Sequence, residues 1–359
     1  MTDIFDYDPY VVSNTEKQAM LTRALAHLHA THSHYCPTYH NIIRTMFPEP
    51  FTAKHDLLAL PYVHVKMFKH AHLKTVQNEQ IIKTLTSSGT SGDVSHIYLD
   101  AETASLQSKV LVKVMQHWIG KARLPMLILD HAGVVSNRRQ FSARGAGIRG
   151  LAFMGRKHCY ALKEDMSLDL DALREFCQQF GDQPVLIFGF TFMVWQYVLA
   201  ELHKHDISFS LPHGILLHSG GWKKLQDQAV SNTTFKQIAA KTLGVTHVHN
   251  FYGMVEQVGA IYVECEHGHL HCPTYSDIRV RRTIDWQPAA IGEEGVIQLI
   301  SALPRSYPGH SILTEDRGVV LGTDDCPCGR LGTYFKVCGR LQQAETRGCS
   351  DTFVKKESA

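Results

Sequence analysis

The sequence predicts an α/β protein in which helices flank a sheet, with a smaller β-rich subdomain near the C-terminal end. Between residues 80 and 260, buried apolar runs alternate with helical patterns, an order typical of a sheet covered by helices. Beyond residue 260, short β-like runs alternate with Gly, Pro and Asp turns. With 44% hydrophobic residues among 359, the chain can bury a sizeable core.

The periodicity of apolar residues places the individual elements. Residues 1–75 are predicted to be mainly helical, because Met20, Leu21, Leu25 and Leu28 recur at helical spacing behind Asn14 or Thr15 as a cap. Apolar runs predict buried strands at 124–130, 184–190, 213–221 and 245–253. Helical patterns cover 168–180 and 233–244, and β-like runs cover 295–301 and 318–322.

Composition narrows the class of protein. Lys plus Arg is 36 and Asp plus Glu is 34, so the formal charge of +2 does not favour a dedicated nucleic-acid binder. The acidic N-terminus lacks a signal pattern, and the apolar run 185–195 is too short to span a bilayer. We therefore expect a cytoplasmic protein that binds neither membrane nor nucleic acid, and the sequence leaves open whether it forms a homo-oligomer.

One segment, TSSGTSG at residues 86–92, combines small hydroxyl residues with glycine and contains no lysine. Such a loop can offer backbone N–H groups and hydroxyls to phosphate oxygens, but it is not a Walker loop. Taken alone, a surface turn explains it as well. The residues are Thr86, Ser87, Ser88, Gly89, Thr90, Ser91 and Gly92.

Later motifs follow this loop in a characteristic order: HSGGW (218–222), FYGMVEQ (251–257), LTEDRG (313–318) and CGRLQQAETRG (338–348). The series resembles the adenylate-forming superfamily over residues 85–348. Among its branches, the chain is most similar to the acyl-protein synthetases of bacterial bioluminescence, which are related to phenylacetate–CoA ligases. The resemblance implies the large N-terminal part of an adenylate-forming enzyme that uses ATP and Mg²⁺.

The resemblance also implies roles for individual residues. The loop 86–92 would bind phosphate, and Glu256 would help to hold Mg²⁺. Asp316 would take the ribose hydroxyls, and Arg340 would reach ribose or phosphate. The remaining predicted nucleotide-binding residues are Tyr252, which matches an aromatic near the adenine, with Gly253, and the strand-end turn Ser219, Gly220 and Gly221.

The change of pattern along the chain predicts a helical region at 1–75, an α/β core at 76–260 and a β-rich subdomain at 261–337, followed by a tail at 338–359. The resemblance implies that the core binds the nucleotide and that the tail is a vestigial hinge. The chain departs from the superfamily pattern in three places. Val94 and Ser95 stand where many members have Pro-Lys, and Gln342 replaces the hinge acid. Because the chain stops at residue 359, the mobile C-terminal domain and its lysine have no room, and Lys223 and Lys224 are the candidate replacements.

Cysteines and histidines suggest two further sites. Cys265, His271, Cys326 and Cys328 could hold one structural zinc ion, the alternative being free thiols in two turns. Cys349 lies in the tail, with Arg347 close by to favour the thiolate. Its placement resembles the acyl-carrying cysteine of the bioluminescence synthetases, so a thiolate attack on an acyl-adenylate is predicted there.

The predicted function is ATP-dependent activation of a carboxylic acid to an acyl-adenylate, with transfer to a thiol and delivery to a partner acyl reductase. Apolar and aromatic stretches at 60–68, 141–150 and 188–195 would line a pocket for a fatty or an aryl acid equally well. Two alternatives stay open at this point. One is aryl-acid adenylation in an antibiotic-type pathway without self-acylation, and the other is an adenylate-binding protein without turnover.

Overall fold

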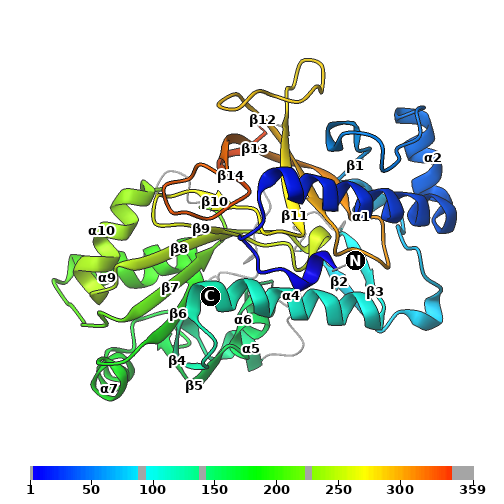
Figure 1. Cartoon of the computed structure of the whole chain (residues 1–359). Helices are drawn as coiled ribbons and strands as arrows, with labels where there is room; N and C mark the ends of the chain where they lie inside the picture. Colours follow the sequence, from blue (N-terminus) through cyan, green and yellow to red (C-terminus); the bar gives the residue numbers. More distant parts are fainter. Residues whose placement is uncertain (1–2, 88–93, 137–142, 223–228, 342–359) are drawn as a thin grey trace. The chain divides into compact units, whose positions relative to one another are not determined.

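The computed structural model describes residues 3–87, 94–136, 143–222 and 229–341 (Figure 1). The described chain falls into two compact units. The first contains residues 3–87, 94–118 and 252–341, and the second contains the described residues between 119 and 251. Among the described residues, no helix is long and apolar enough to cross a membrane.

The second unit is built on parallel strands in the order β8-β7-β6-β4-β5, which follow one another in Figure 1. Its central strands are buried along nearly their whole length, as expected for a parallel sheet with helices on its faces. The strands are β4 (Leu124–His131), β5 (Gly155–Leu162), β6 (Val185–Phe190), β7 (Gly214–Ser219) and β8 (His247–Tyr252). The helices are α5 (Gly133–Ser136), α6 (Ala143–Ala152), α7 (Leu170–Phe180), α8 (Thr191–Met193), the π-helical η4 (Val194–Leu199), α9 (Ala200–Lys204) and α10 (Asn232–Leu243).

The first unit is built on antiparallel strands in the order β11-β12-β13-β14-β10-β9, with the short β1 running parallel to β13. A separate hairpin pairs β2 with β3. The strands are β1 (Val63–His64), β2 (Lys83–Thr86), β3 (His96–Leu99), β9 (Tyr262–Glu264), β10 (Leu270–His271), β11 (Ser276–Arg281), β12 (Glu294–Ser301), β13 (Ser311–Thr323) and β14 (Thr333–Arg340). The helices are α1 (Asn14–Tyr35), α2 (Pro37–Met46), α3 (Met67–His70) and α4 (Ala101–Ile119), with 3-10 turns η1 (Ile4–Asp6), η2 (Leu57–Ala59), η3 (Asn78–Gln80) and η6 (Val255–Gln257).

All the strands and helices predicted between residues 124 and 322 are confirmed, with ends shifted by one or two residues, except that β13 begins seven residues before the predicted start at 318. The predicted cap of α1 was wrong by one or two positions. Ser13 has extended backbone angles, and its Oγ accepts a hydrogen bond from the Glu16 N–H, whereas Asn14 is already helical. The helical prediction also fails for residues 47–66, where prolines at 48, 50 and 61 remove backbone donors and leave only η2 and β1.

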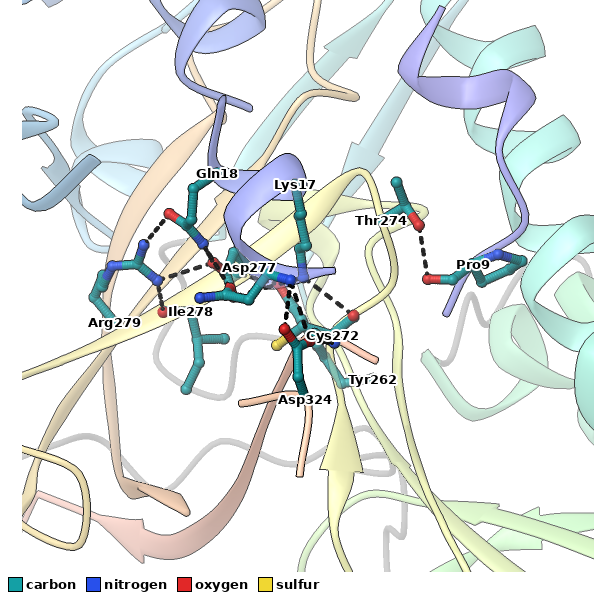
Figure 2. A network of polar contacts seen from close by, with 12 residues as sticks. Pro9, Lys17, Gln18, Tyr262, Cys272, Thr274, Asp277, Ile278, Arg279 and Asp324 are labelled. Carbon is teal, nitrogen blue, oxygen red and sulfur yellow. Dashed lines mark hydrogen bonds and ion pairs between the residues drawn. The ribbon is translucent and has the colours of Figure 1, made fainter. Parts of the chain in front are cut away.

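A buried ionic network fixes the start of α1 to β11 (Figure 2). Lys17 is 1% exposed, and its Nζ donates to the Cys272 carbonyl at 3.1 Å and lies 3.7 Å from Asp277 Oδ1. The second Asp277 oxygen accepts from Gln18 at 2.5 Å and from Arg279 at 2.9 Å. Burial alone would raise the pKa of Asp277, but the charges of Lys17 and Arg279 outweigh it and hold that pKa well below its usual range.

Three buried histidines surround Tyr39 where α1 and α2 meet the 304–310 segment. His29 Nδ1 lies 2.9 Å and His310 Nε2 lies 3.3 Å from the Tyr39 hydroxyl, and the His32 ring stacks on His310 with centroids 5.0 Å apart. His32 Nδ1 also lies 2.7 Å from Thr75 Oγ1. Burial lowers the pKa of all three rings, that of His32 to about 3, so the cluster is held together by neutral imidazoles.

Candidate nucleotide site and metal centre

Tyr252, Asp316 and Arg340 form one polar cluster in the first unit. Asp316 on β13 and Arg340 at the end of β14 are direct partners in the antiparallel register, which brings the Arg340 Nε to 3.1 Å from Asp316 Oδ1. The Tyr252 hydroxyl donates to the other oxygen, Oδ2, at 2.7 Å. The carboxylate is therefore oriented from both sides, and each of its oxygens keeps a lone pair for another donor.

The aromatic ring of Tyr252 is fixed by two neighbours. Tyr262 and Phe335 lie 6.2 and 6.3 Å away between ring centroids. Burial, and then the Asp316 carboxylate, raise the pKa of Tyr252 well above its usual value, so its hydroxyl stays a proton donor to Asp316. The adjacent Gly253 lies where a Cβ would come within 3.2 Å of Ile261 Cγ2. An oriented carboxylate beside a ring and an arginine can bind a hydroxylated, anionic ligand.

Glu256 is a buried carboxylate in η6, 3% exposed, and its Oε1 accepts a 2.6 Å hydrogen bond from Ser95 Oγ. Ser95 in turn pairs with Ser87 at the base of the predicted phosphate loop, and we call this pair of residues the neck of the loop. The Ser95 N–H donates to Ser87 Oγ at 2.9 Å, and the Ser87 N–H donates to the Ser95 carbonyl at 3.3 Å. Thr86 and His96 close the adjoining β2–β3 pair. The neck of the loop thus contacts the predicted metal-binding glutamate directly.

The predicted strand-end turn lies in the second unit, at the carboxyl end of β7. Ser219 Oγ donates to the Phe251 carbonyl on β8 at 2.8 Å, which ties the two parallel strands together at their ends. Gly220 has φ +86°, a conformation that a residue with a side chain adopts only with strain, and the next residue, Gly221, has open space where a Cβ would stand. The carboxyl edge of a parallel sheet is where open α/β sheets bind ligands.

Polar side chains that the sequence did not single out also gather at this edge of the second unit. Asp130 at the end of β4 pairs with Arg144 at 2.9 Å, and Arg144 is buried. Burial raises the pKa of Asp130, with Arg144 opposing the shift. On β7, His218 Nδ1 contacts Thr191 Oγ1 at 2.9 Å while its ring stacks on Phe235. In the sequence, the position of Asp130 and His218 near the ends of predicted strands was the signal that could have indicated them.

Two cysteine-containing turns of the first unit bring four predicted ligands together. The ligand atoms of Cys265, His271, Cys326 and Cys328 all lie within 4.8 Å of one another. Cys265 Sγ is 3.9 Å from Cys326 Sγ, close to the separation of about 3.8 Å that two thiolates have on a tetrahedral zinc ion. Cys328 Sγ is 3.3 Å from His271 Nε2, and burial lowers the pKa of His271 to about 3, so its imidazole is neutral. The donor set fits zinc.

Several predicted residues lie outside the described part of the chain. From the loop these are Ser88, Gly89, Thr90, Ser91 and Gly92. The candidate adenylation lysines, Lys223 and Lys224, also lie outside it, as do Gln342 and the predicted acyl acceptor Cys349.

The fold matches known adenylate-forming enzymes. The chain superposes on an open conformation of 2-hydroxyisobutyryl-CoA ligase in complex with 2-HIB-AMP and CoA with a TM-score of 0.68, covering 93% of this chain and 77% of that one at 16% identity. The same ligase in its thioesterification state gives a TM-score of 0.67 with 93% and 71% coverage, again at 16% identity. The chain therefore shares the fold of this ligase.

The family model described as "Acyl-protein synthetase, LuxE" matches residues 1–357, and the chain belongs to this family. Among curated proteins it is similar to the long-chain-fatty-acid–luciferin-component ligase of Aliivibrio fischeri, with 23% identity over 304 residues, covering 82% of this chain and 78% of the relative. The Vibrio harveyi ligase of the same name is 20% identical over 310 residues, with 82% and 77% coverage. The chain is thus an acid ligase of the adenylate-forming type, and the resemblance seen in the motifs is confirmed.

Proposed function

We propose that this protein activates a long-chain fatty acid with ATP and Mg²⁺, forming acyl-AMP and pyrophosphate, and then transfers the acyl group to a thiol. The observation that carries the proposal is the Tyr252–Asp316–Arg340 cluster, in which three residues from separate motifs converge on one carboxylate. Asp316 would accept hydrogen bonds from the ribose hydroxyls, and Arg340 would place a positive charge beside the nucleotide.

In the adenylation step, the acid carboxylate attacks the α-phosphorus of ATP, an acyl–phosphate bond forms, and the bond to the pyrophosphate leaving group breaks. Two anions have to meet, so the step depends on charge neutralisation and alignment. Glu256 is the residue that would hold Mg²⁺, since a carboxylate oxygen is a ligand this hard cation prefers. The ion would supply charge neutralisation on the phosphates, and Thr86 and Ser87 would orient them from the loop.

A fatty acid is the preferred substrate because both curated relatives carry a long-chain fatty acid in their names. Neither relative is named as an enzyme of antibiotic biosynthesis, so the aryl-acid alternative gains no support from them.

The acyl group would pass to Cys349. Its thiolate attacks the acyl carbonyl, the thioester forms, and AMP leaves with the electron pair of the broken mixed anhydride bond. A positive charge from Arg347, two positions before Cys349 in the sequence, would favour the thiolate. The thioester would then be delivered to a partner acyl reductase.

The first experiment is acid-dependent exchange of labelled pyrophosphate into ATP, run with a panel of fatty and aryl acids. We expect exchange that requires Mg²⁺ and is fastest with long-chain fatty acids. Exchange with aryl acids alone would establish the aryl-acid alternative, and binding of ATP without any exchange would leave an adenylate-binding protein without turnover.

The second experiment follows the acyl group. After incubation with ATP, Mg²⁺ and labelled acid, we expect label on the denatured protein that neutral hydroxylamine removes. Cys349→Ser should lose this label, whereas the matched variant Cys177→Ser, a cysteine of α7, should keep it. Full labelling of Cys349→Ser would show that another group is the acceptor.

We also propose that Cys265, His271, Cys326 and Cys328 bind one structural zinc ion, on the support of their spacing. The purified protein should contain about one zinc per chain. Cys326→Ser should lose the metal and melt at a lower temperature, while Cys177→Ser keeps it. A metal-free wild type whose melting temperature does not rise with added zinc would overturn this assignment.

A further inference from the structure

Ser95 occupies a position where many superfamily members carry a lysine, and the structure gives its hydroxyl a specific partner. Ser95 is fully buried, at 0% exposed, and Glu256 is 3% exposed. The 2.6 Å distance from Ser95 Oγ to Glu256 Oε1 lies at the short end of the range for hydrogen bonds between two oxygens.

The backbone of Ser95 is fixed at the same time. Its N–H donates to Ser87 Oγ at 2.9 Å, and its carbonyl accepts from the Ser87 N–H at 3.3 Å. These two bonds join the residues on either side of the phosphate loop. Directly after Ser95, His96 pairs with Thr86 in the β2–β3 hairpin. Ser95 therefore has little freedom to move, and its hydroxyl direction is set by the neck of the loop.

We propose that Ser95 is a positioning residue that orients Glu256 for metal binding and couples it to the neck of the phosphate loop. This inference rests on the proposed function, because it assigns Glu256 to the metal. Ser95 acts through Glu256 and through the loop neck.

The chemistry of the donor explains why a hydroxyl suits this place. A lysine ammonium beside Glu256 would neutralise the carboxylate and compete with a divalent cation for its oxygens. A hydroxyl donates one hydrogen bond to Oε1 and leaves the negative charge of the carboxylate in place. In a buried setting, one fixed hydrogen bond also selects a single rotamer of the glutamate. Ser95 therefore orients the Glu256 carboxylate, and it does so without the positive charge that a lysine would place at this position.

The test is the Mg²⁺ dependence of Ser95→Ala. At saturating ATP and fatty acid, we expect the Mg²⁺ concentration for half-maximal pyrophosphate exchange to rise about tenfold or more, the usual effect of losing a hydrogen bond to a charged group. The maximal rate at saturating Mg²⁺ should fall much less. A residue with a merely structural role would lower the rate or the melting temperature without moving the Mg²⁺ requirement.

Ser306→Ala is the matched control. Ser306 is also a fully buried serine of the first unit, and its Oγ donates to the Tyr98 carbonyl at 2.8 Å. This variant removes the same atom but should keep the wild-type Mg²⁺ dependence. Ser95→Thr, which retains a hydroxyl, should keep most of the Mg²⁺ affinity. Ser95→Cys keeps the size of the side chain but donates only a weak hydrogen bond, so it should raise the Mg²⁺ requirement, and it decides the question if Ser95→Ala fails to fold.

The inference is overturned if Ser95→Ala and Ser306→Ala show the same Mg²⁺ dependence as the wild type. To separate it from the proposed function, ATP affinity is measured by calorimetry at several Mg²⁺ concentrations, which needs no turnover. A wild type that binds ATP with Mg²⁺ but never exchanges pyrophosphate refutes the proposed function alone. In that case the Mg²⁺ dependence of ATP binding by Ser95→Ala, measured by the same calorimetry, still decides the role of Ser95. A wild type that binds no ATP refutes both.

Discussion

Two buried aspartates on the sheet of the first unit, Asp277 and Asp316, have partners of similar chemistry but differ in how completely they are enclosed. The Asp277 side chain is 0% exposed and is surrounded by Lys17, Arg279 and Gln18. The Asp316 side chain is 12% exposed, and its partner Arg340 is 34% exposed. The first carboxylate is enclosed by protein groups, with two hydrogen bonds on Oδ2 and the Lys17 ion pair beside Oδ1. The second is oriented by protein groups and is still reachable.

The difference teaches how to separate a stabilising network from a binding site when both contain buried charges. A closed network compensates its charges internally, so removing one member leaves an unpaired charge in the interior. An open cluster keeps part of its hydrogen-bonding capacity for a ligand. Variants at Asp277 partners should therefore change stability, and variants at Asp316 or Glu256 should change activity.

The largest effect is expected for Lys17→Met, which keeps most of the length of the side chain and removes its charge. Breaking a buried ion pair should lower the free energy of unfolding by about 3–5 kcal/mol, measured by urea denaturation. Arg282→Gln is the matched control, since the Arg282–Asp285 pair is 40% exposed on both sides and should change stability by only about 0–1 kcal/mol. Equal losses in the two variants would contradict the distinction between buried and exposed pairs.

Glu256→Gln should have the largest effect on activity. The variant keeps the shape of the side chain and removes one negative charge, so pyrophosphate exchange should fall by about two orders of magnitude. The melting temperature should change little in comparison with Lys17→Met. Wild-type exchange in the variant would refute the assignment of Glu256 to the metal.

Asp316→Asn tests the comparison most directly, because it weakens the open Asp316 cluster as Lys17→Met breaks the closed Asp277 network. We expect the KM for ATP to rise about tenfold, the effect of weakening a charge-assisted hydrogen bond to the ligand, with a small change in unfolding free energy. Steady-state kinetics and urea denaturation of the same preparation measure both quantities. A large stability loss with unchanged KM would place Asp316 in the same class as Asp277.

Acid should affect the two classes of buried group at different pH. For His32, the folded-state pKa of about 3 lies below the ordinary value of 6.5, so its contribution to stability is complete above pH 6.5 and declines as the pH falls from 6.5 towards 3. The slope for this one histidine is about 1.4 kcal/mol per pH unit. Asp277, whose pKa is depressed, loses its contribution only below its ordinary value.

Urea denaturation between pH 7 and 4 measures this slope, and His32→Asn should flatten it. A neutral, hydrogen-bonding side chain at this position removes the proton uptake on unfolding. If the variant and the wild type lose stability with the same slope, another group controls the acid response.

The parts of the fold that the sequence predicted are those with local signals. β4, β6 and β7 are short apolar runs in the sequence. The four candidate zinc ligands are recognisable because cysteine and histidine occur together in two short segments. The clusters that depend on long-range pairing were not predicted. Ser95 and Glu256 are 161 positions apart, and the sequence showed only that a lysine was missing at Ser95. Only the three-dimensional register shows that a hydroxyl contacts the glutamate there.

The cluster of Tyr252, Asp316 and Arg340 was predicted from motif order and not from a local pattern of residues. Asp316 and Arg340 are placed opposite each other by the β13–β14 register, and no periodicity in either segment indicates that pairing. Their assignment came from the order of motifs shared with a superfamily. The Lys17 network had no such motif, and a lysine on a helix ordinarily indicates a solvated face, so its burial against Asp277 was not predictable.

The first unit is discontinuous along the chain, and this has a consequence during translation. Gln18 and Lys17 leave the ribosome long before Asp277, which lies 259 residues beyond Gln18. At synthesis rates of about 5–20 residues per second, the first helix therefore waits roughly 13–50 seconds for its acidic partner. The parallel strands β4 to β8 are complete within that interval. The nascent chain thus completes the strands of its second unit before the buried charge of Lys17 can meet Asp277.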